Sequence, residues 1–218
     1  MNFELLIDPV SASFVVLGTC AATLARSGWR DSCETFAQIA ELTRKPFEMT
    51  QARAELSSQV TRMQRDGVIR TQPRAVSDRE LTEATAALVY HRSIDALVDE
   101  HDRHSAQRRA RREQAVATLN EAGELAPVLG LAGTLLALSQ LPGTDLITEG
   151  AVMSSVSQAV VSTFYGLILG HLLFLPLASA IQRRGRLEDS QRSKLVAWLV
   201  EQLEPACPSS ASRVSDAA

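Results

Sequence analysis

The sequence of residues 125–182 is LAPVLGLAGTLLALSQLPGTDLITEGAVMSSVSQAVVSTFYGLILGHLLFLPLASAIQ. Two apolar runs of roughly 18 and 30 residues flank the break PGTDLITEG, and each is long enough to cross a hydrocarbon core about 30 Å thick. The stretch contains no Lys or Arg, and its only carboxylates, Asp145 and Glu149, lie in the break. The sequence therefore predicts a transmembrane hairpin over 125–182.

A further transmembrane helix is predicted at the N-terminus, within residues 1–25. Asp8-Pro9 is typical of a helix start, because proline is tolerated in the first turn and a carboxylate interacts favourably with the positive helix end. The segment lacks the basic region of a cleaved signal peptide and carries Glu4 and Asp8 instead. We therefore expect a retained span, which gives three spans in all.

The segment between these spans, residues 26–124, is polar and highly charged, and it predicts a cytoplasmic helical domain. Helix ends are expected near Pro46, Gly67 and Pro73. From Ser77 onward the next proline is Pro127, so a single helix is expected to continue from the domain into the membrane. The predicted fold class is an all-α membrane protein.

The chain after the hairpin is expected to form a cytoplasmic helix over 183–204 and a disordered tail over 205–218. The helix carries one apolar face, and the tail is small, polar and interrupted by proline. The apolar face consists of Leu187, Leu195, Val196, Leu199, Val200 and Leu203.

The distribution of charge predicts the orientation. All 22 Lys and Arg residues lie in 26–124 or 183–218, and positively charged segments stay in the cytoplasm. Three spans then place the N-terminus in the periplasm and the C-terminus in the cytoplasm. The run of arginines at 108, 109, 111 and 112 is interpreted as a juxtamembrane cluster that contacts anionic lipid headgroups, rather than as a nucleic-acid site.

The sequence shows no pattern typical of an enzyme. It has no phosphate-binding glycine loop, no nucleophile–base pair and no His/Cys cluster. Cys20, Cys33 and Cys207 have neither metal-ligand spacing nor the pattern of a disulfide framework. We therefore expect no catalytic residues, no cofactor and no metal site.

Polar side chains recur along the last span at intervals of three or four residues and share a helical stripe. In hydrocarbon such a stripe faces a neighbouring helix, a partner or water. Two interpretations stay open: helix–helix contacts through hydroxyl hydrogen bonds, and a hydrated path or partner-binding face. The stripe comprises Ser154, Ser155, Gln158, Ser162 and Tyr165, with Thr163 beside it.

Small residues and prolines complete the pattern of the hairpin. The glycines are of the kind that lets membrane helices approach closely, and the prolines remove backbone hydrogen bonds and are typical of kinks. The glycines are Gly130, Gly133, Gly166 and Gly170, and the prolines are Pro127 and Pro176.

The apolar parts of the hairpin lack an acid that could carry a proton. Apart from Tyr165, the lone titratable side chain there is His171, and a lone histidine is more often a packing residue than a proton relay. If this chain conducts protons, the carboxylate must come from another chain.

Two motifs of the hairpin resemble the MotA/TolQ/ExbB proton-channel family. APVLGLAGTLLAL (126–138) and VVSTFYGLILGHLLFLPLASAI (160–181) are similar to two successive spans of that family, the second especially to its MotA version. IDPVSASFVVLGTCAATLA (7–25) is similar to the MotA span that precedes the cytoplasmic domain.

The resemblance implies a pentameric ring in the bacterial inner membrane around a dimer of single-span partners of the MotB, ExbD or TolR type, which bring the proton-binding aspartate. By motif position it implies that Thr134 and Thr163 face the pore and that Pro127 and Pro176 lie near the path. The expected path residues are therefore Thr134, Thr163, Ser162, Tyr165 and Gln158.

Two departures leave the subgroup open. MotA-type chains have another span before the one matched at 7–25, and the three-span plan is that of ExbB and TolQ. ExbB and TolQ in turn carry a glutamate at the position aligned with Gln158. The predicted function is a proton-channel subunit that couples proton-motive force to mechanical work. The alternatives are a structural membrane scaffold and a membrane-anchored adaptor, neither of which conducts ions.

Overall fold

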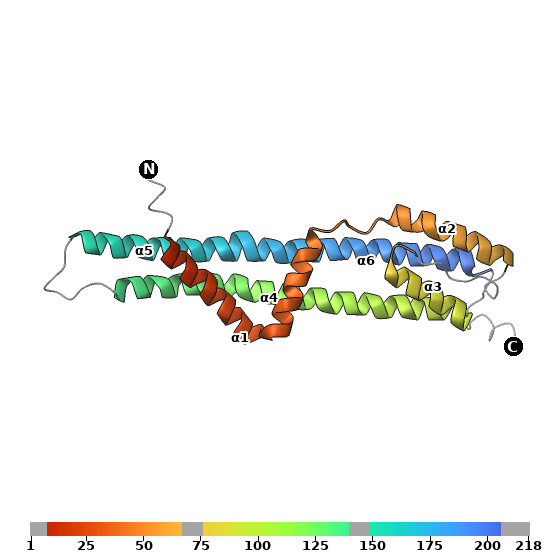
Figure 1. Cartoon of the computed structure of the whole chain (residues 1–218), viewed down its shortest axis with the longest axis horizontal. Helices are drawn as coiled ribbons and strands as arrows, with labels where there is room; N and C mark the ends of the chain where they lie inside the picture. Colours follow the sequence, from red (N-terminus) through yellow and green to blue (C-terminus); the bar gives the residue numbers. More distant parts are fainter. Residues whose placement is uncertain (1–7, 67–75, 140–148, 206–218) are drawn as a thin grey trace. The chain divides into compact units, whose positions relative to one another are not determined.

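The structure is a computed structural model that describes residues 8–66, 76–139 and 149–205. All regular elements within these ranges are helical, which confirms the predicted all-α fold. The predicted tail, beyond Pro205, lies outside the described residues. In chain order the helices are α1 (Pro9–Leu42), α2 (Met49–Asp66), α3 (Arg79–His91), α4 (Ile94–Ser139), α5 (Glu149–Leu167), the π-helical segment η2 (Ile168–Phe174) and α6 (Leu175–Leu203) (Figure 1).

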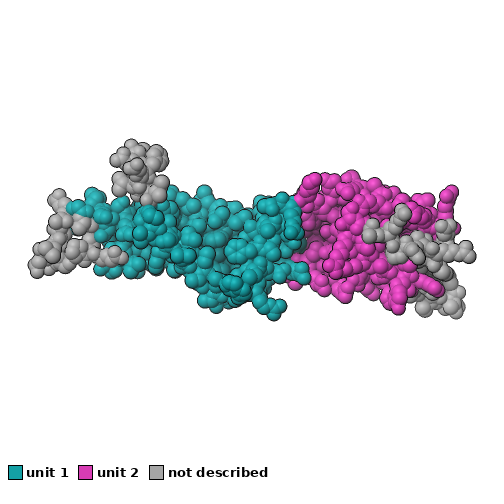
Figure 2. Space-filling model, viewed as in Figure 1, with its two compact units in different colours: residues 1–44, 111–183 teal, residues 45–110, 184–218 magenta. Residues whose placement is uncertain are grey.

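The chain divides into two compact units (Figure 2). Unit 1 comprises residues 1–44 and 111–183, and unit 2 comprises residues 45–110 and 184–218. Three helices are long and apolar enough to cross a membrane: Pro9–Leu42, Ile94–Ser139 and Val152–Leu203. This number confirms the predicted three-span plan, and the apolar sequences of all three spans belong to unit 1.

Helix α1 begins at the predicted Asp8-Pro9 step and bends at Gly28. The Asp8 carboxylate accepts hydrogen bonds from the Val10 amide (3.1 Å) and the Ser11 hydroxyl (2.6 Å), which caps the helix. Gly28 has φ 82° and ψ 165°, a conformation that side-chain-bearing residues rarely adopt. The bend divides α1 into a first arm before Gly28 and a second arm after it (Figure 1).

The second arm of α1 makes polar contacts with α4 and carries two exposed aromatic side chains. Gln114 of α4 donates to Asp31 (2.8 Å), and Arg111 pairs with Glu34 (3.6 Å). On the opposite side, Trp29 is 73% exposed and Phe36 is 70% exposed. Ile39 and Leu42 of the same arm pack on an apolar cluster that includes Leu119 of α4. The two exposed aromatic side chains instead require an apolar or interfacial environment outside the chain.

Helices α4 and α5 pack with their backbones in contact through glycine. An added Cβ on Gly166 would lie 2.6 Å from the Ala126 carbonyl oxygen and 3.0 Å from the Gly130 Cα. One turn later, a Cβ on Gly170 would lie 2.5 Å from the Gly123 carbonyl oxygen. Real Cβ contacts are never this short, so the observed spacing of the two helices requires glycine at both positions.

The two prolines of the hairpin have different consequences for the backbone. Pro127 lies inside the continuous helix α4, and its ring contacts the Gly170 position. Pro176 follows η2, in which the Leu175 amide donates to the Gly170 carbonyl oxygen five residues earlier. A proline cannot donate to the residue four positions before it and clashes with that carbonyl, so the wider π turn accommodates Pro176.

The expectation of one unbroken helix from Ser77 into the membrane is wrong. Helix α3 ends at His91, and Arg92 adopts the left-handed conformation with φ 54° and ψ 36°. The Ser93 hydroxyl then accepts a hydrogen bond from the Asp95 amide (3.2 Å) at the start of α4. A serine that can cap a new helix offers the backbone an alternative to continuing the old one.

Unit 2 has a conventional apolar core formed by α2, α3, the first part of α4 and the end of α6. The apolar face predicted for 183–204 supplies part of this core, whereas Leu187 at its start is 65% exposed. The core includes Leu56, Val60, Met63, Leu81, Leu88, Ile94, Leu97, Leu195, Leu199 and Leu203.

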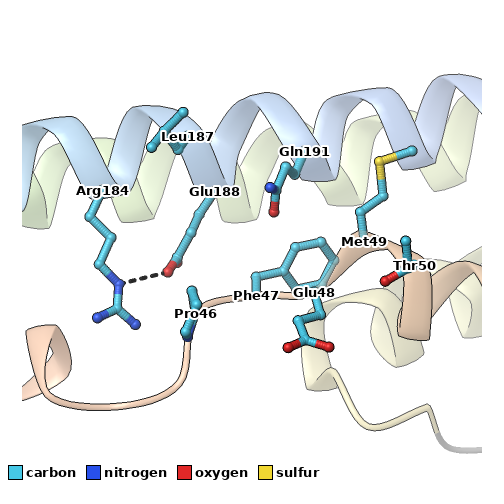
Figure 3. Close-up of a pocket in the computed structure, with 9 residues that line it drawn as sticks. All are labelled: Pro46, Phe47, Glu48, Met49, Thr50, Arg184, Leu187, Glu188 and Gln191. Atoms are coloured by element: carbon cyan, nitrogen blue, oxygen red, sulfur yellow. Dashed lines mark hydrogen bonds and ion pairs between the residues drawn. The ribbon is translucent and has the colours of Figure 1, made fainter.

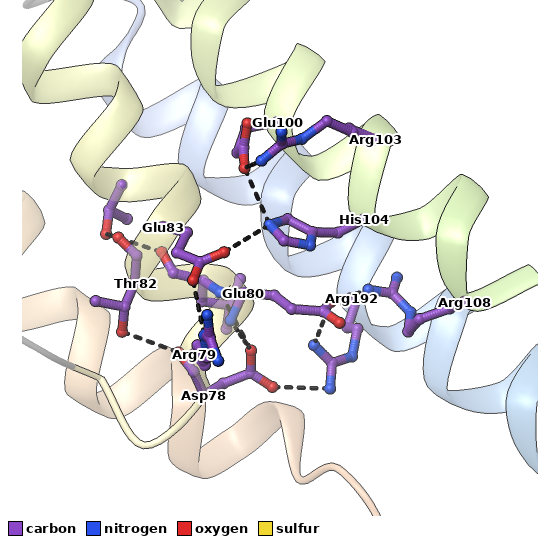
Figure 4. A network of polar contacts seen from close by, with 12 residues as sticks. Asp78, Arg79, Glu80, Thr82, Glu83, Glu100, Arg103, His104, Arg108 and Arg192 are labelled. Carbon is purple, nitrogen blue, oxygen red and sulfur yellow. Dashed lines mark hydrogen bonds and ion pairs between the residues drawn. The ribbon is translucent and has the colours of Figure 1, made fainter. Parts of the chain in front are cut away.

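A buried ion-pair network ties α3, α4 and α6 together in unit 2 (Figure 4). Arg108 pairs with Glu80 and with Asp189 (3.1 Å), and Arg192 pairs with Asp78 (2.8 Å) and Glu80 (3.0 Å). The Asp189 side chain is only 8% exposed. Arg108 therefore serves the interior of unit 2 and is not available to lipid headgroups.

Substituting Gly166 with alanine tests the glycine contact of unit 1. Gly166→Ala is expected to cost about 1–3 kcal/mol of stability, because the new methyl group overlaps two backbone atoms of α4. Thermal unfolding of the detergent-solubilised protein measures the change. Gly150→Ala is the matched control, because a Cβ there meets no atom within 4 Å. Equal unfolding temperatures for the two variants would contradict the contact.

Candidate functional site

The residues predicted to form the path lie on the hairpin helices of unit 1. Thr134 is on α4, and Gln158, Ser162, Thr163 and Tyr165 are on α5. These two helices run side by side (Figure 1), and the contacts at Gly130 and Gly166 set their register.

Ser162 lies in the contact between α4 and α5. Its side chain is 1% exposed, and its hydroxyl donates a hydrogen bond to the Gly130 carbonyl oxygen at 3.1 Å. A Cβ added to Gly133 would lie 2.0 Å from the Ser162 Oγ. Glycine at 133 therefore leaves the space that the Ser162 hydroxyl occupies.

Thr134 and Thr163 keep their hydroxyl groups on the surface of the hairpin. Both side chains are partly exposed, and each hydroxyl donates to its own helix: Thr134 to the Leu131 carbonyl (2.6 Å) and Thr163 to the Ala159 carbonyl (3.3 Å). This bond satisfies the donor and leaves the oxygen lone pairs directed away from the backbone. Each threonine thus offers a hydrogen-bond acceptor on an otherwise apolar surface.

Gln158 of the last span lies near the beginning of α1. Its side chain approaches the Asp8 carboxylate, which accepts hydrogen bonds from the Val10 amide and the Ser11 hydroxyl. The sequence identified Asp8 only as a helix start, and no local pattern links residues so far apart in the chain. One turn beyond Ser162, Tyr165 is partly exposed, with its ring beside that of Phe164.

The electrostatics of the described hairpin are those of a neutral surface. Within 125–139 and 149–182 the titratable side chains are those of Glu149, Tyr165 and His171. His171 is exposed on η2. Serine and threonine hydroxyls can hydrogen-bond to a carboxylate in either protonation state, but they do not change charge themselves at physiological pH. The site can therefore line an ion path, whereas a proton carrier must be supplied to it.

Large apolar side chains surround this hydroxyl-bearing surface. A single soluble chain rarely exposes so many on two adjacent helices, so lipid or other protein chains must cover them. Those at least 40% exposed on the hairpin include Val128, Leu131, Leu135, Leu136, Val160, Phe164, Leu167, Leu172 and Leu173.

Unit 2 contains a hollow of about 360 Å³ between residues 46–50 and residues 184–191 of α6 (Figure 3). Arg184 pairs with Glu188 at 2.9 Å along one side of it, and the Phe47 ring lies 4.5 Å from the Arg192 guanidinium. An ion pair and a stacked arginine are structural contacts, and this hollow shares no residue with the hydroxyl-bearing surface.

Fold and site together define a multi-pass helical membrane protein whose last two spans present a neutral polar surface. The MotA/TolQ/ExbB proton channel family matches residues 69–194, more than half of the chain, and the chain belongs to this family. It is accordingly a membrane protein of the bacterial inner membrane from a family of channels.

Relatives named for motility and chemotaxis match the chain. It is 21% identical over 216 residues to Motility protein A of Bacillus subtilis (strain 168), covering 95% of this chain and 78% of that protein. It is 28% identical over 110 residues to Chemotaxis protein PomA of Vibrio alginolyticus, covering 46% and 43%.

Solved structures show the same fold. The flagellar MotAB stator complex from Bacillus subtilis superimposes with a TM-score of 0.82 at 19% identity, covering 95% of this chain and 83% of that one. The C. jejuni MotAB structure gives a TM-score of 0.80 at 16% identity, with coverages of 94% and 82%.

A double-mutant cycle tests the hydrogen bond from the Ser162 hydroxyl to the Gly130 carbonyl and the space that Gly133 leaves for it. Gly133→Ala is expected to destabilise the protein because its methyl group displaces the hydroxyl from Gly130. Ser162→Ala removes only one interhelical hydrogen bond, worth about 0.6 kcal/mol in a membrane protein. Since both changes act on one bond, Gly133→Ala combined with Ser162→Ala should cost clearly less than the sum of the two. Unfolding temperatures that add would contradict the contact.

Proposed function

We propose that this chain is the ring-forming subunit of a proton-driven stator and that protons pass along the hydroxyl-bearing surface of its last two spans. The observation that carries the proposal is that Thr134 and Thr163 are partly exposed on a hairpin whose apolar parts contain no acid. Hydroxyl groups placed in this way can hydrogen-bond to and orient a carboxylate that belongs to another chain.

The partner that supplies the carboxylate is proposed to be a dimer of single-span MotB-like proteins, enclosed by a pentameric ring of this chain. The solved relatives are described as MotAB stator complexes, which supports a complex of this kind. The exposed apolar side chains around Thr134 and Thr163 provide surface for neighbouring copies and for the partner helices. Proton movement would then drive rotation of ring against dimer.

The proposed output is motility. The relatives that match this chain include two named Motility protein A and one named Chemotaxis protein PomA. These names favour a flagellar stator over the Tol- and Ton-type outputs of the same family. Gln158, at the position where ExbB and TolQ carry a glutamate, also distinguishes this chain from those two subgroups.

The proposed orientation places the N-terminus and the hairpin turn in the periplasm, and unit 2 and the C-terminus in the cytoplasm. All 22 Lys and Arg residues lie outside 1–25 and 125–182. The second arm of α1 then lies at the cytoplasmic membrane surface. Trp29, 73% exposed and close to Arg26, is the type of residue found at the level of the headgroups.

Replacing both surface threonines tests proton conduction. Thr134→Val together with Thr163→Val keeps the shape of each side chain but removes its oxygen. We expect proton flux into vesicles reconstituted with the partner to fall by about 10²-fold, the lower end of what positioned proton-transfer groups contribute, while ring assembly is unchanged. The measurement is quenching of a pH-sensitive dye after a potential is imposed.

Thr19→Val is the matched control for this experiment. Thr19 is also a membrane-span threonine, and its hydroxyl donates to the Val15 carbonyl of its own helix at 2.7 Å, but it lies on α1 and is buried. Unchanged flux in the double variant would contradict the channel and favour the scaffold. Function retained by residues 26–124 alone would favour the adaptor.

Cysteine labelling tests the orientation. In a chain without its native cysteines, Ser139→Cys should react with a membrane-impermeant maleimide in intact spheroplasts, because Ser139 ends α4 beside the proposed outer turn. Glu201→Cys in α6 should react only after permeabilisation. Both parent residues are exposed, so accessibility within the chain does not limit either reaction. The opposite labelling pattern would invert the proposed topology.

A further inference from the structure

A cluster of one histidine and two glutamates joins α3 to α4 within unit 2 (Figure 4). Glu83 comes from α3, and Glu100 and His104 lie one turn apart on α4. One ligand atom from each, namely a carboxylate oxygen of each glutamate and the histidine Nε2, lie within 4.8 Å of one another. No metal site was expected from the sequence, because the ligands are divided between two helices and form no ligand motif.

The spacing of these atoms matches that of ligands on one metal ion. The His104 Nε2 is 3.0 Å from Glu83 Oε2 and 3.0 Å from Glu100 Oε1. With metal–ligand bonds of about 2.1 Å, neighbouring ligand atoms lie about 3.0 Å apart in an octahedral site and about 3.4 Å apart in a tetrahedral one. A cation can therefore be bound with small side-chain movements.

The His104 Nε2 also lacks a hydrogen bond. The atom is closed off from solvent, and although it lies between the two carboxylates (Figure 4), neither oxygen meets it in hydrogen-bond geometry. Buried polar atoms of this kind normally have a partner. A cation held between the nitrogen and the two oxygens would give the His104 Nε2 the partner that it lacks.

We propose that Glu83, Glu100 and His104 bind a divalent cation of the Zn²⁺ class. Imidazole nitrogen selects borderline transition metals over Ca²⁺ and Mg²⁺, and carboxylates are accepted by the same ions. Water completes the coordination, since three protein ligands leave at least one position open. The bound ion would tie α3 to α4 and stiffen unit 2, a property independent of ion conduction.

Two arginines set the affinity of this site. Arg79 donates to Glu83 Oε1 (2.7 Å) and leaves Oε2 facing His104. Arg103 instead pairs with Glu100 Oε1, the oxygen that faces His104. A metal ion must displace Arg103, whose side chain is 61% exposed and free to turn into solvent.

Isothermal titration with Zn²⁺ tests the proposal on the full-length protein, solubilised in detergent and freed of metal with a chelator. We expect one saturable site per chain. His104→Gln and Glu83→Gln should each weaken binding by more than the ~10–100-fold that loss of an outer-shell partner costs. Arg103→Ala should tighten binding, because it frees the Glu100 oxygen.

Two matched variants control for general effects. His91→Gln removes an exposed histidine at the end of α3, and Arg109→Ala removes another exposed arginine of α4. Neither should change the affinity. Circular dichroism of each metal-free variant establishes that it folds. If a ligand variant fails to fold, the tighter binding of Arg103→Ala is the deciding measurement.

Three results would overturn the proposal. These are the absence of saturable Zn²⁺ binding in the parent chain, binding that survives in folded His104→Gln, and an affinity unaffected by Arg103→Ala. Each would show that the cluster is an ion-pair network only. Proton flux is not part of these measurements, so their outcome is independent of the proposed stator function.

Discussion

The contact between the backbones of α4 and α5 determines the rest of unit 1. At Gly130 and Gly166 no side chain separates the helices, and at Gly170 a carbonyl oxygen of α4 occupies the space of a missing Cβ. In a membrane the hydrophobic effect does not drive helices together, so close packing and interhelical hydrogen bonds must do so. The glycines bring the Gly130 carbonyl within reach of the Ser162 hydroxyl, and the register of the hairpin follows.

The two units are stabilised by different physics. In unit 1 neutral helices pack through small residues, whereas the ion pairs join α4 to the residues of α1 on either side of the Gly28 bend. Unit 2 combines an apolar core with a buried network around Arg108, Asp189 and Arg192. Breaking one member of such a network leaves an uncompensated charge, so the network fixes which faces of α3, α4 and α6 meet.

Much of the fold was predictable because its signals are local. Hydropathy located the three spans, the Asp8-Pro9 step located the start of α1, and a period of three to four residues gave the buried face of the last helix. The break at Arg92 was missed because the apolar stripe continues on both sides of it. In that situation a single capping serine decides between one helix and two.

The site was predictable only in part, because it depends on contacts between residues that are far apart in the sequence. Residue types indicated which side chains were unusual in a membrane, and the family motifs indicated Thr134 and Thr163. Neither could show that Gln158 approaches Asp8, that Arg108 pairs with Asp189, or that Glu83 meets His104. Such pairs depend on which helix faces are apposed, and periodicity within one helix carries no information about its neighbour.

The sequence left open whether the polar stripe of the last span makes helix contacts or lines a path, and the helix itself reconciles the two. Successive residues on an α-helix point about 100° apart. Ser162 therefore points into α4 and is buried, while the next residue, Thr163, points away from that contact and keeps its oxygen at the surface. A bond that locks one hydroxyl in the interface fixes the direction of its neighbour. The contact and the proposed path are then adjacent faces of one helix, and a path of this kind depends on the rigidity of the contact.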